Sequence, residues 1–429
     1  MNTNIDVNQM GLCQMLRAID EGVCTTEALI NACFDRIDAR ELEVGAWQVQ
    51  RSREEYLAAY RAQQDFYDAS LLKGLPLGVK DIIDTEEMLT EMGSPIHAGR
   101  QPIEDASCVA LLRAAGGIVL GKTVTTEFAY FKPGKTKNPA DLSRTPGGSS
   151  SGSAAAIADD MVPMALGSQT AASVIRPAAY CGAIGYVGSR GEFSLRGGQP
   201  LAQSLDSLGL FARQIEDVQL LRAILLRQPA SIAPASAQLP SCVLLCRGES
   251  VGEVSPEMQV ATEKAVVLLQ AQGVKVIELD AGERIKEMVT HHINIMAWEV
   301  CRNLVMESFH KEQLSGPLAA LIEQGLSMDR ATYVASLAAV ESGREWLWSF
   351  APEADAILTP AAPGIAPLGH EATGAPHMSR PWQAMGLPVI NVPGMVDDNG
   401  VPLGLQLVGK ARQDDTLLTY ASGLMPLFV

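Results

Sequence analysis

No stretch of this chain reaches the roughly 18 consecutive apolar residues that a membrane-spanning helix requires. The polar start at residues 1–6 also lacks the basic and apolar regions of a signal peptide. The first absence argues against a membrane protein and the second against a secreted one. We therefore expect a cytoplasmic protein that has no membrane partner.

Positive charge is scarce as well. The chain has 33 Lys and Arg residues against 49 Asp and Glu residues, which gives a formal net charge of −16 at pH 7. Such a chain repels phosphate backbones, so we expect no nucleic acid as a direct partner. A small molecule is the favoured ligand, and the sequence leaves a homodimer open.

Cysteine is sparse and scattered. The eight Cys residues lie mostly inside apolar runs, where a reduced thiol behaves as a small hydrophobic group. His291 and His292 are adjacent, so on a helix they point about 100° apart and cannot hold one ion together. We therefore predict structural thiols and no metal site.

The residues that are present favour a large globular fold. Of the 429 residues, 47% are hydrophobic although only 5% are aromatic, which suffices for a sizeable core. Capping signals at Ser52 with Glu55, at Asp105 and at Ser255 predict helices that begin there. Strand patterns occur at residues 75–79, 117–120, 161–166, 242–245, 274–279, 356–358, 389–392 and 403–408.

This alternation predicts the α/β class, with one large sheet covered by helices rather than several small domains. Residues 281–350 show a helical pattern without strand signals. We predict a single domain over residues 1–429, in which 281–350 is a helical insertion that shapes the substrate pocket.

Two loops of small residues are the most informative feature. Residues 147–156 read Gly-Gly-Ser-Ser-Ser-Gly-Ser-Ala-Ala-Ala, and residues 167–173 read Gly-Ser-Gln-Thr-Ala-Ala-Ser. Little side-chain bulk lets backbone N–H groups and Ser hydroxyls approach a substrate closely, as acyl transfer requires. The loops predict a serine-dependent amide hydrolase.

Six segments together resemble the amidase signature family, from about residue 70 to the end of the chain: 75–81, 143–153, 173–182, 358–363, 386–388 and 404–409. The resemblance implies a single α/β domain with a large mixed β-sheet between helices. It also implies hydrolysis of an amide C–N bond by a Ser-cis-Ser-Lys triad, without metal or organic cofactor. By motif, the lysine falls on Lys80, the bridging serine on Ser149 and the nucleophile on Ser173.

Elementary chemistry is consistent with this assignment. A Ser hydroxyl is a weak nucleophile until a base takes its proton, and Lys can be that base only when burial lowers its pKa well below about 10.4. Lys80 ends an apolar run, which suits burial at a strand end. Ser149 would relay the proton from Ser173 to Lys80, and the same path would return it to the leaving nitrogen.

The resemblance places the oxyanion hole in the backbone amides just before the nucleophile, at Thr170, Ala171, Ala172 and Ser173. The family commonly has Gly-Gly where this chain has Ala171-Ala172, so the two methyl groups either narrow the acyl pocket or require negative φ at both positions. Gln169 stands where the family commonly has Asp. We therefore expect a neutral hydrogen bond from Gln169 to Arg144 in place of an ion pair.

Arg176 refines the expected substrate. It lies three positions past Ser173, a spacing similar to the malonamidase-like branch of the family, in which the corresponding Arg holds a substrate carboxylate. A guanidinium suits a carboxylate through two parallel hydrogen bonds. The alternative is an Arg that ties loops together, and the sequence does not separate the two.

Three other interpretations compete with a small-molecule amidase. The chain could be the glutamine-hydrolysing subunit of a tRNA-dependent amidotransferase, although the charge of −16 and the Arg176 spacing count against this. Gly148 to Gly152 also fits the Gly-x-Ser-x-Gly nucleophile elbow, with Ser150 as nucleophile and His370 or His377 as base, but no strand precedes it. Ala171-Ala172 alone suggests a catalytically inactive binding protein.

Overall fold

The computed structural model describes residues 7–280 and 283–428, so the polar start at residues 1–6 lies outside the described residues. In this part of the chain eleven strands form one sheet, in the order β1-β3-β2-β4-β6-β5-β10-β11-β9-β7-β8. The strands are β1 (Trp47–Gln50), β2 (Pro76–Lys80), β3 (Ile118–Thr123), β4 (Met164–Gln169), β5 (Ile184–Val187), β6 (Ser207–Ala212), β7 (Cys242–Leu245), β8 (Lys275–Glu278), β9 (Ala356–Pro360), β10 (Val389–Val396) and β11 (Pro402–Val408).

The sheet is mixed. β2 pairs in parallel with both β3 and β4, and β7 pairs in parallel with β8 and β9, whereas the other pairs are antiparallel. In the β2–β4 pair Leu77 lies opposite Met164 and Val79 opposite Leu166. The carboxyl ends of β2 and β4 therefore meet at the same edge of the sheet, which is where such folds place ligands.

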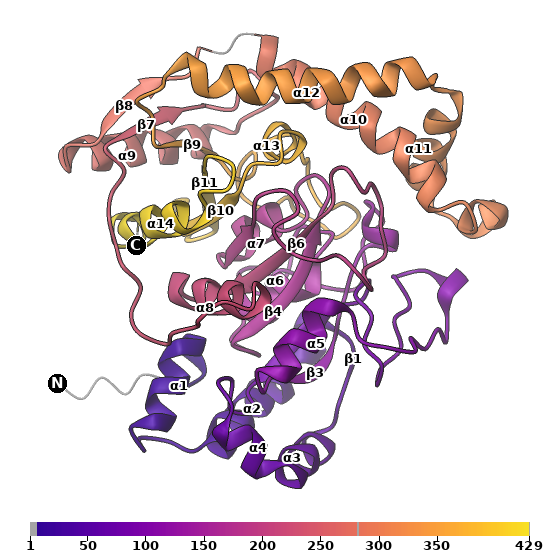
Figure 1. The fold of residues 1–429 in the computed structure, drawn as a ribbon, viewed down its shortest axis with the longest axis vertical. Coiled ribbons are helices and arrows are strands. Elements are labelled where there is room, and N and C mark those ends of the chain that lie inside the picture. Colours follow the sequence, from indigo (N-terminus) through magenta and orange to yellow (C-terminus); the bar gives the residue numbers. More distant parts are fainter. Residues whose placement is uncertain (1–6, 281–282, 429) are drawn as a thin grey trace.

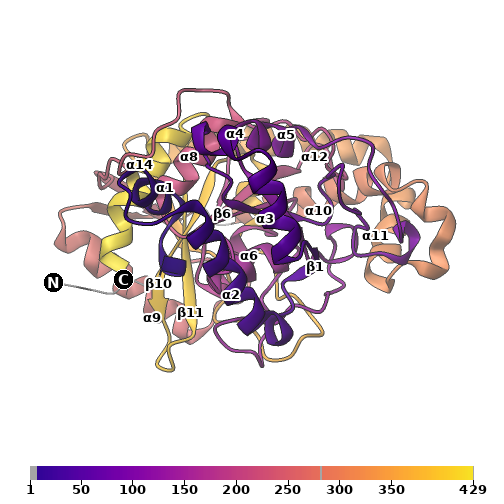
Figure 2. The same cartoon turned by 90° about the horizontal axis from the view of Figure 1, so that it is seen from below.

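Helices cover the sheet on both faces, as the α/β prediction requires (Figures 1 and 2). They are α1 (Leu12–Asp20), α2 (Thr26–Val44), α3 (Arg53–Ala62), α4 (Gln64–Ala69), α5 (Ser107–Ala114), α6 (Ser151–Ala158), α7 (Ile175–Cys181), α8 (Ile215–Leu225), α9 (Pro256–Ala271), α10 (Glu283–Asn303), α11 (Gly316–Ser327), α12 (Arg330–Phe350), α13 (Arg380–Ala384) and α14 (Asp414–Phe428). Short 3-10 helices lie at Val7–Gln9, Pro95–His97, Glu127–Ala129 and Glu307–Gln313.

Two of the three capping predictions are confirmed. Ser52 and Glu55 form a reciprocal capping box at the start of α3, and the Ser255 hydroxyl accepts a hydrogen bond from the amide of Met258 in α9. The Asp105 prediction is wrong, because α5 begins at Ser107 and its preceding residue makes no side-chain cap. Tertiary contacts occupy the Asp105 carboxylate instead: it accepts from a distant backbone amide and pairs with Arg113 at 2.9 Å.

Every strand expected from the sequence is present, but β1, β5 and β6 were not expected. β5 and β6 each carry a glycine within a short run, which weakens the strand signal, and yet all their residues are buried. β6 lies between β4 and β5. It therefore completes the central part of the sheet, next to the strand that leads into the second small-residue loop.

The segment at 281–350 is helical, as predicted, over the part that the structure describes; residues 281–282 lie outside it. The long helices α10 and α12 lie side by side at the end of the molecule opposite α3 and α4 (Figure 1). Within residues 7–280 and 283–428, no helix combines the length and the hydropathy that crossing a bilayer requires.

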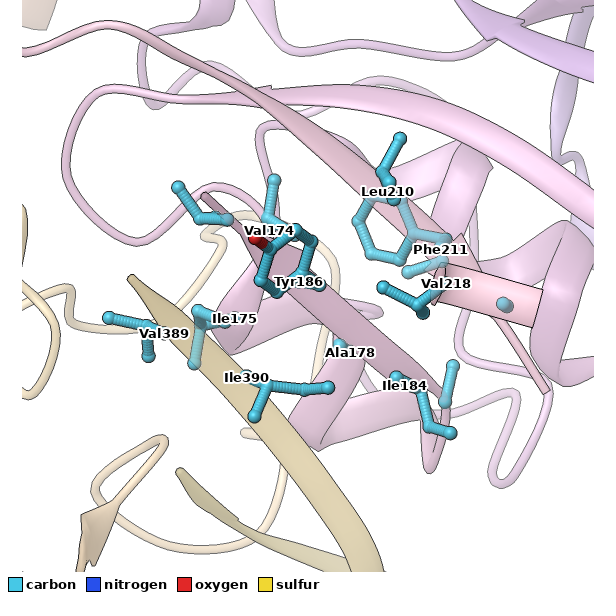
Figure 3. Close-up of a cluster of buried hydrophobic side chains, with 14 of the residues drawn as sticks. Val174, Ile175, Ala178, Ile184, Tyr186, Leu210, Phe211, Val218, Val389 and Ile390 are labelled. Carbon is cyan, nitrogen blue, oxygen red and sulfur yellow. The ribbon is translucent and has the colours of Figure 1, made fainter. Parts of the chain in front are cut away.

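A buried apolar cluster anchors the start of α7. Figure 3 shows Val174 and Ile175, which directly follow Ser173, among side chains from β5, β6 and β10. Val174, Ile175 and Tyr186 are fully buried. Because such close packing leaves little freedom, the backbone at Ser173 is held against the centre of the sheet.

Candidate active site

Lys80 and Ser149 meet at the carboxyl end of β2. The Lys80 Nζ atom lies 2.7 Å from Ser149 Oγ and 2.9 Å from Ser168 Oγ, and both contacts are hydrogen bonds. Ser149 precedes α6 and follows a cis peptide bond from Gly148. Ser168 is in β4, the parallel neighbour of β2. The structure thus brings together two of the predicted residues and adds Ser168, which the sequence did not single out.

The ammonium form of Lys80 is strongly disfavoured. Its side chain is fully buried, and burial lowers the pKa of the Lys80 amine well below its ordinary value, although the nearby Asp206 carboxylate opposes this. Hydrogen bonds to two neutral hydroxyls add no negative charge to offset the desolvation. Burial of Lys80 therefore favours the uncharged amine, the form that a general base needs.

Ser173 lies two residues before α7 and lines a small pocket, with a cavity volume of about 30 Å³, together with Ser149. Its hydroxyl has no hydrogen-bond partner within the described part of the chain, so it is not bonded to Ser149 or Lys80. The Ser173 carbonyl accepts a hydrogen bond from the amide of Ser150 at 3.2 Å, which ties the two Ser-containing loops together. The enclosed volume is well below the usual range for small-molecule sites, so the pocket suits only a small ligand.

Free backbone donors surround Ser173. The amides of Ala171, Ala172 and Ser173 have no hydrogen-bond acceptor among the residues that the structure describes. Ala171 and Ala172 both line the pocket, and neither has a positive φ. The two methyl groups therefore narrow the pocket without backbone strain, and the three N–H groups are available for a developing oxyanion.

The expected hydrogen bond between Gln169 and Arg144 is absent, and this prediction is corrected. Gln169 Oε1 accepts from the amides of Val174 and Ile175 at 2.9 and 3.1 Å, and so caps the start of α7. Arg144 pairs with Asp141 and donates to a distant backbone carbonyl. Gln169 therefore holds the loop that contains Ser173 against the start of α7.

Arg176 lines the pocket, but most of its donors are occupied. Its two terminal nitrogens donate to the carbonyls of Gly374 and Gly148, at 2.7 and 2.6 Å, and to the Thr373 hydroxyl at 3.1 Å. The Nε atom is buried without a partner. Burial lowers the pKa of Arg176 to about 10, and Arg380 nearby adds to the shift. Arg176 therefore ties two loops together at the pocket wall, which is the alternative that the sequence left open.

Sequence reasoning missed a second buried arginine, Arg380, at the first position of α13. Its Nη1 donates to Nδ1 of His292 at 2.9 Å, and the opposite ring nitrogen of His292 lies 2.8 Å from the carbonyl oxygen of Thr170. Because Arg380 can only donate, His292 must be neutral with its proton on Nε2. Two hydrogen bonds in series therefore link Arg380 of α13, through His292 of α10, to Thr170 in the loop that contains the free amides.

The side chain of Thr170 is hydrogen-bonded as well as its carbonyl. Its hydroxyl donates to Asp206 at 2.6 Å, and burial raises the pKa of Asp206 to about 6. The backbone amides of Leu201 and Ala202 donate to the same carboxylate. Asp206 therefore helps to hold Thr170 in place. No sequence motif marks Asp206, so only the tertiary structure indicates this role.

We expect His292 to make folding stability pH-dependent. Burial, reinforced by Arg380, lowers the pKa of His292 well below 6.5, so the unfolded chain takes up a proton more readily than the folded one. The free energy of unfolding should therefore fall as pH drops below about 6.5. In His292→Gln, which retains an acceptor and a donor, urea unfolding at pH 7.5 and pH 5 should show a smaller loss.

The exposed His310 provides the matched control for this measurement. His310→Gln should keep the wild-type dependence of stability on pH. If His292→Gln lost as much stability between pH 7.5 and pH 5 as the wild type does, the neutral state of His292 would not contribute to folding.

The nucleophile-elbow alternative has little support. Ser150 is fully buried, and its hydroxyl bonds the backbone carbonyl and amide of Ser168 at 3.2 and 3.3 Å. His370 and His377 contact the carbonyls of Leu142 and Glu253, respectively, and neither contacts Ser150. Ser150 therefore fixes the loop to β4.

Metal ligands do not gather at this pocket. Within residues 7–280 and 283–428, one group of potential ligand atoms lies close together, at Cys13, Glu216 and Asp217. Glu216 pairs with Arg17, and Asp217 accepts from the amide of Cys13, so these atoms already have protein partners. All eight Cys residues are free thiols and seven are buried, as their apolar sequence contexts predicted.

The sheet order and the helical layers define the α/β fold of the amide hydrolases that carry the amidase signature. Residues 28–418 match the family model described as Amidase. The chain therefore belongs to the amidase signature family and is a hydrolase that acts on carbon–nitrogen bonds.

Curated relatives and solved structures agree with this assignment. The chain is similar to a glutamyl-tRNA(Gln) amidotransferase subunit from Desulfatibacillum aliphaticivorans, with 29% identity over 92% of both chains. It is 30% identical to the corresponding protein of Lysinibacillus sphaericus (strain C3-41), over 94% of this chain and 93% of that protein. A crystal structure described as an amidase has a TM-score of 0.86 and 26% identity, and covers 98% of this chain and 100% of its own. The fold also matches 6-aminohexanoate cyclic dimer hydrolase, with a TM-score of 0.85, 20% identity and coverage of 99% and 98%.

Proposed function

We propose that this chain hydrolyses the C–N bond of a small amide through an ester on Ser173, with Ser149 and Lys80 as the proton relay. The observation that carries the proposal is the buried Lys80 amine, 2.7 Å from Ser149 Oγ, together with a free Ser173 hydroxyl that lines the same pocket as Ser149. A buried lysine without a carboxylate within ion-pair distance is costly in a purely structural role. It is useful as a base.

Ser173 Oγ attacks the amide carbon while its proton passes to Ser149 Oγ, and the proton of Ser149 passes to Lys80 Nζ. The oxyanion is stabilised by the free amides of Ala171, Ala172 and Ser173, and one such donor is typically worth about 3 to 4 kcal/mol. The proton then returns through Ser149 to the leaving nitrogen, which departs as ammonia or an amine. Water cleaves the ester by the same relay.

The pocket lining favours a substrate with negative charge. Arg176 and Arg380 both line it, whereas none of its lining residues is Asp or Glu. Met296 of α10 forms part of the wall, which supports the proposal that the helical segment at 281–350 shapes the pocket. Substrate binding through Arg176, as in the malonamidase-like branch, remains a prediction.

A glutamine-hydrolysing subunit of a tRNA-dependent amidotransferase is the second candidate. The curated relatives favour it over a free-standing amidase. Two of them are named as amidotransferase subunits and are 29% and 30% identical to this chain over nearly their whole length. The two arginines of the pocket suit the carboxylate of glutamine, whereas the lining offers no carboxylate for the ammonium group of glutamine. The two candidates differ in whether the chain works without a partner protein.

Turnover by the isolated chain tests both candidates. We expect ammonia release from small amides, capture of the ester as a hydroxamate when hydroxylamine is added, and an acyl adduct in the intact mass. Strict dependence on glutamine together with a partner protein would favour the amidotransferase alternative. Absence of turnover and of any adduct with every amide would contradict the proposal and support the binding-protein alternative.

We place the protein in the cytoplasm. The eight free thiols support a reducing compartment, because disulfides form and persist mainly in oxidising ones. Fractionation of the native protein with a compartment marker tests this placement.

A further inference from the structure

Two buried guanidinium groups face the reacting serine without a counter-charge. Arg176 and Arg380 are 4% and 7% exposed, and both line the pocket that contains Ser173. Among residues 7–280 and 283–428, neither has a carboxylate within ion-pair distance. Arg380 and Arg176 also repel each other, and burial lowers the pKa of Arg380 to about 10.

The two arginines differ in the donors they leave free. Arg176 spends three hydrogen bonds on Gly148, Thr373 and Gly374. Arg380 makes one, through Nη1 to His292, so its Nη2 and Nε donors have no partner in the part of the chain that the structure describes. The free edge of a guanidinium is the side that binds a carboxylate through two parallel bonds.

Burying like charges together without an anion is unfavourable, and proteins retain such an arrangement where a ligand supplies the opposite charge. We infer that Arg380 binds a carboxylate on the acyl part of the substrate, so that the enzyme selects anionic amides. This inference rests on the proposed function and names its substrate class. Arg176 adds the second positive charge, and its hydrogen bonds hold the loops of the pocket wall together.

The size and connections of the pocket restrict the substrate further. The enclosed volume is only about 30 Å³, so the pocket favours a short chain that carries the scissile amide and the carboxylate on one molecule. A half-amide of a short dicarboxylic acid has this form. Because Arg380 also bonds His292, and His292 bonds the Thr170 carbonyl, a carboxylate at Arg380 lies two hydrogen bonds from the oxyanion loop.

Steady-state kinetics with a matched substrate pair tests the inference. Succinamate carries a carboxylate and an amide, whereas succinamide has the same length without charge. We expect the wild type to prefer succinamate, and Arg380→Met to lose about 30-fold or more in kcat/KM for succinamate but only about 3-fold for succinamide. Arg380→Lys should recover part of the loss, because it restores the charge without the planar fork.

Arg190, which is half-buried, provides the control for a change at an arginine near the site. It is close to the site and donates to the Gln383 carbonyl, but it does not line the pocket. Arg190→Lys should lower kcat/KM for both substrates equally, if at all. An equal loss on both substrates in Arg380→Met would reduce Arg380 to a structural role.

A binding measurement separates failure of this inference from failure of the proposed function. Ser173→Ala protein is titrated with succinate and with succinamide in a calorimeter, alone and combined with Arg380→Met. We expect succinate to bind and the Arg380→Met change to weaken that binding by about 30-fold. If no amide were hydrolysed but succinate bound through Arg380, the proposed chemistry would fail and the anion site would stand. Equal succinate binding with and without Arg380 would overturn the inference, whatever the catalysis.

Discussion

Ser173→Ala protein is expected to fold normally and to hydrolyse amides at least about 10⁴-fold more slowly than the wild type. The Ser173 hydroxyl has no partner within the described residues, so its removal leaves no buried group unsatisfied. It would, however, remove the atom that forms the ester. Ammonia release and the melting temperature together check both parts of the expectation.

Ser150→Ala is the matched control within the same run of serines. The Ser150 hydroxyl bonds the backbone of Ser168 on both its amide and its carbonyl, so its loss should cost about 1 to 2 kcal/mol of stability. Most of the activity should remain. Loss of activity in Ser150→Ala but not in Ser173→Ala would replace this mechanism with the nucleophile elbow.

Lys80→Met should have two opposite effects. Activity should fall by about 10³-fold or more, because the relay loses its base. Stability at pH 7 should rise, because Met fills a similar volume without the desolvation that lowers the pKa of the Lys80 amine. Three neutral hydrogen bonds, to the hydroxyls of Ser149 and Ser168 and to the Ser168 carbonyl, each worth about 1 kcal/mol, are lost in exchange. Urea unfolding and initial rates measure the two effects.

The sign of the pH dependence follows from the lowered pKa. Because burial lowers the pKa of Lys80 in the folded chain, the unfolded chain holds the Lys80 proton more tightly, so this residue destabilises the fold until the pH approaches about 10.4. The stability gained in Lys80→Met should therefore shrink as the pH rises from 7 to 10. In the wild type, kcat/KM should rise with pH through the pKa of Lys80, and that limb should be absent in Lys80→Met.

A second buried lysine offers the control. Lys122, in the neighbouring strand β3, lies 3.6 Å from Asp81, and burial lowers its pKa to about 8. Lys122→Met would leave Asp81 buried without its partner, so stability should fall while the chemistry is retained. A gain of stability in both variants, or a loss of activity in both, would contradict the distinct role of Lys80.

Local signals in the sequence were enough for much of the fold. The strand that ends at Lys80 and the capping box at Ser52 depend on neighbouring residues, and both were predicted. β5 and β6 were missed because glycines interrupt short runs whose stability comes from strands on either side. The cap predicted at Asp105 was wrong because Arg113 and a distant amide compete for its carboxylate.

The same distinction between local sequence signals and tertiary contacts applies to the site. Lys80, Ser149 and Ser173 stand in ordered motifs, so the sequence singled them out, and the pairing of β2 with β4 then explains how the first two meet. Gln169 was given the wrong partner, because hydrogen-bond geometry is set by the turn into α7. Arg380 and His292 carry no motif at all.

The sequence by itself determined which chemical groups the chain carries and the α/β alternation that holds them, because periodicity, caps and small-residue loops are local properties. The tertiary structure alone decided which groups share one pocket, that Lys80 is fully buried, and that Arg380 retains a free edge beside Ser173. Burial and pairing depend on residues far apart in the chain: Lys80 and Ser149 are separated by 69 positions, and Arg380 and His292 by 88. A charge without a partner is therefore visible only once the chain has folded.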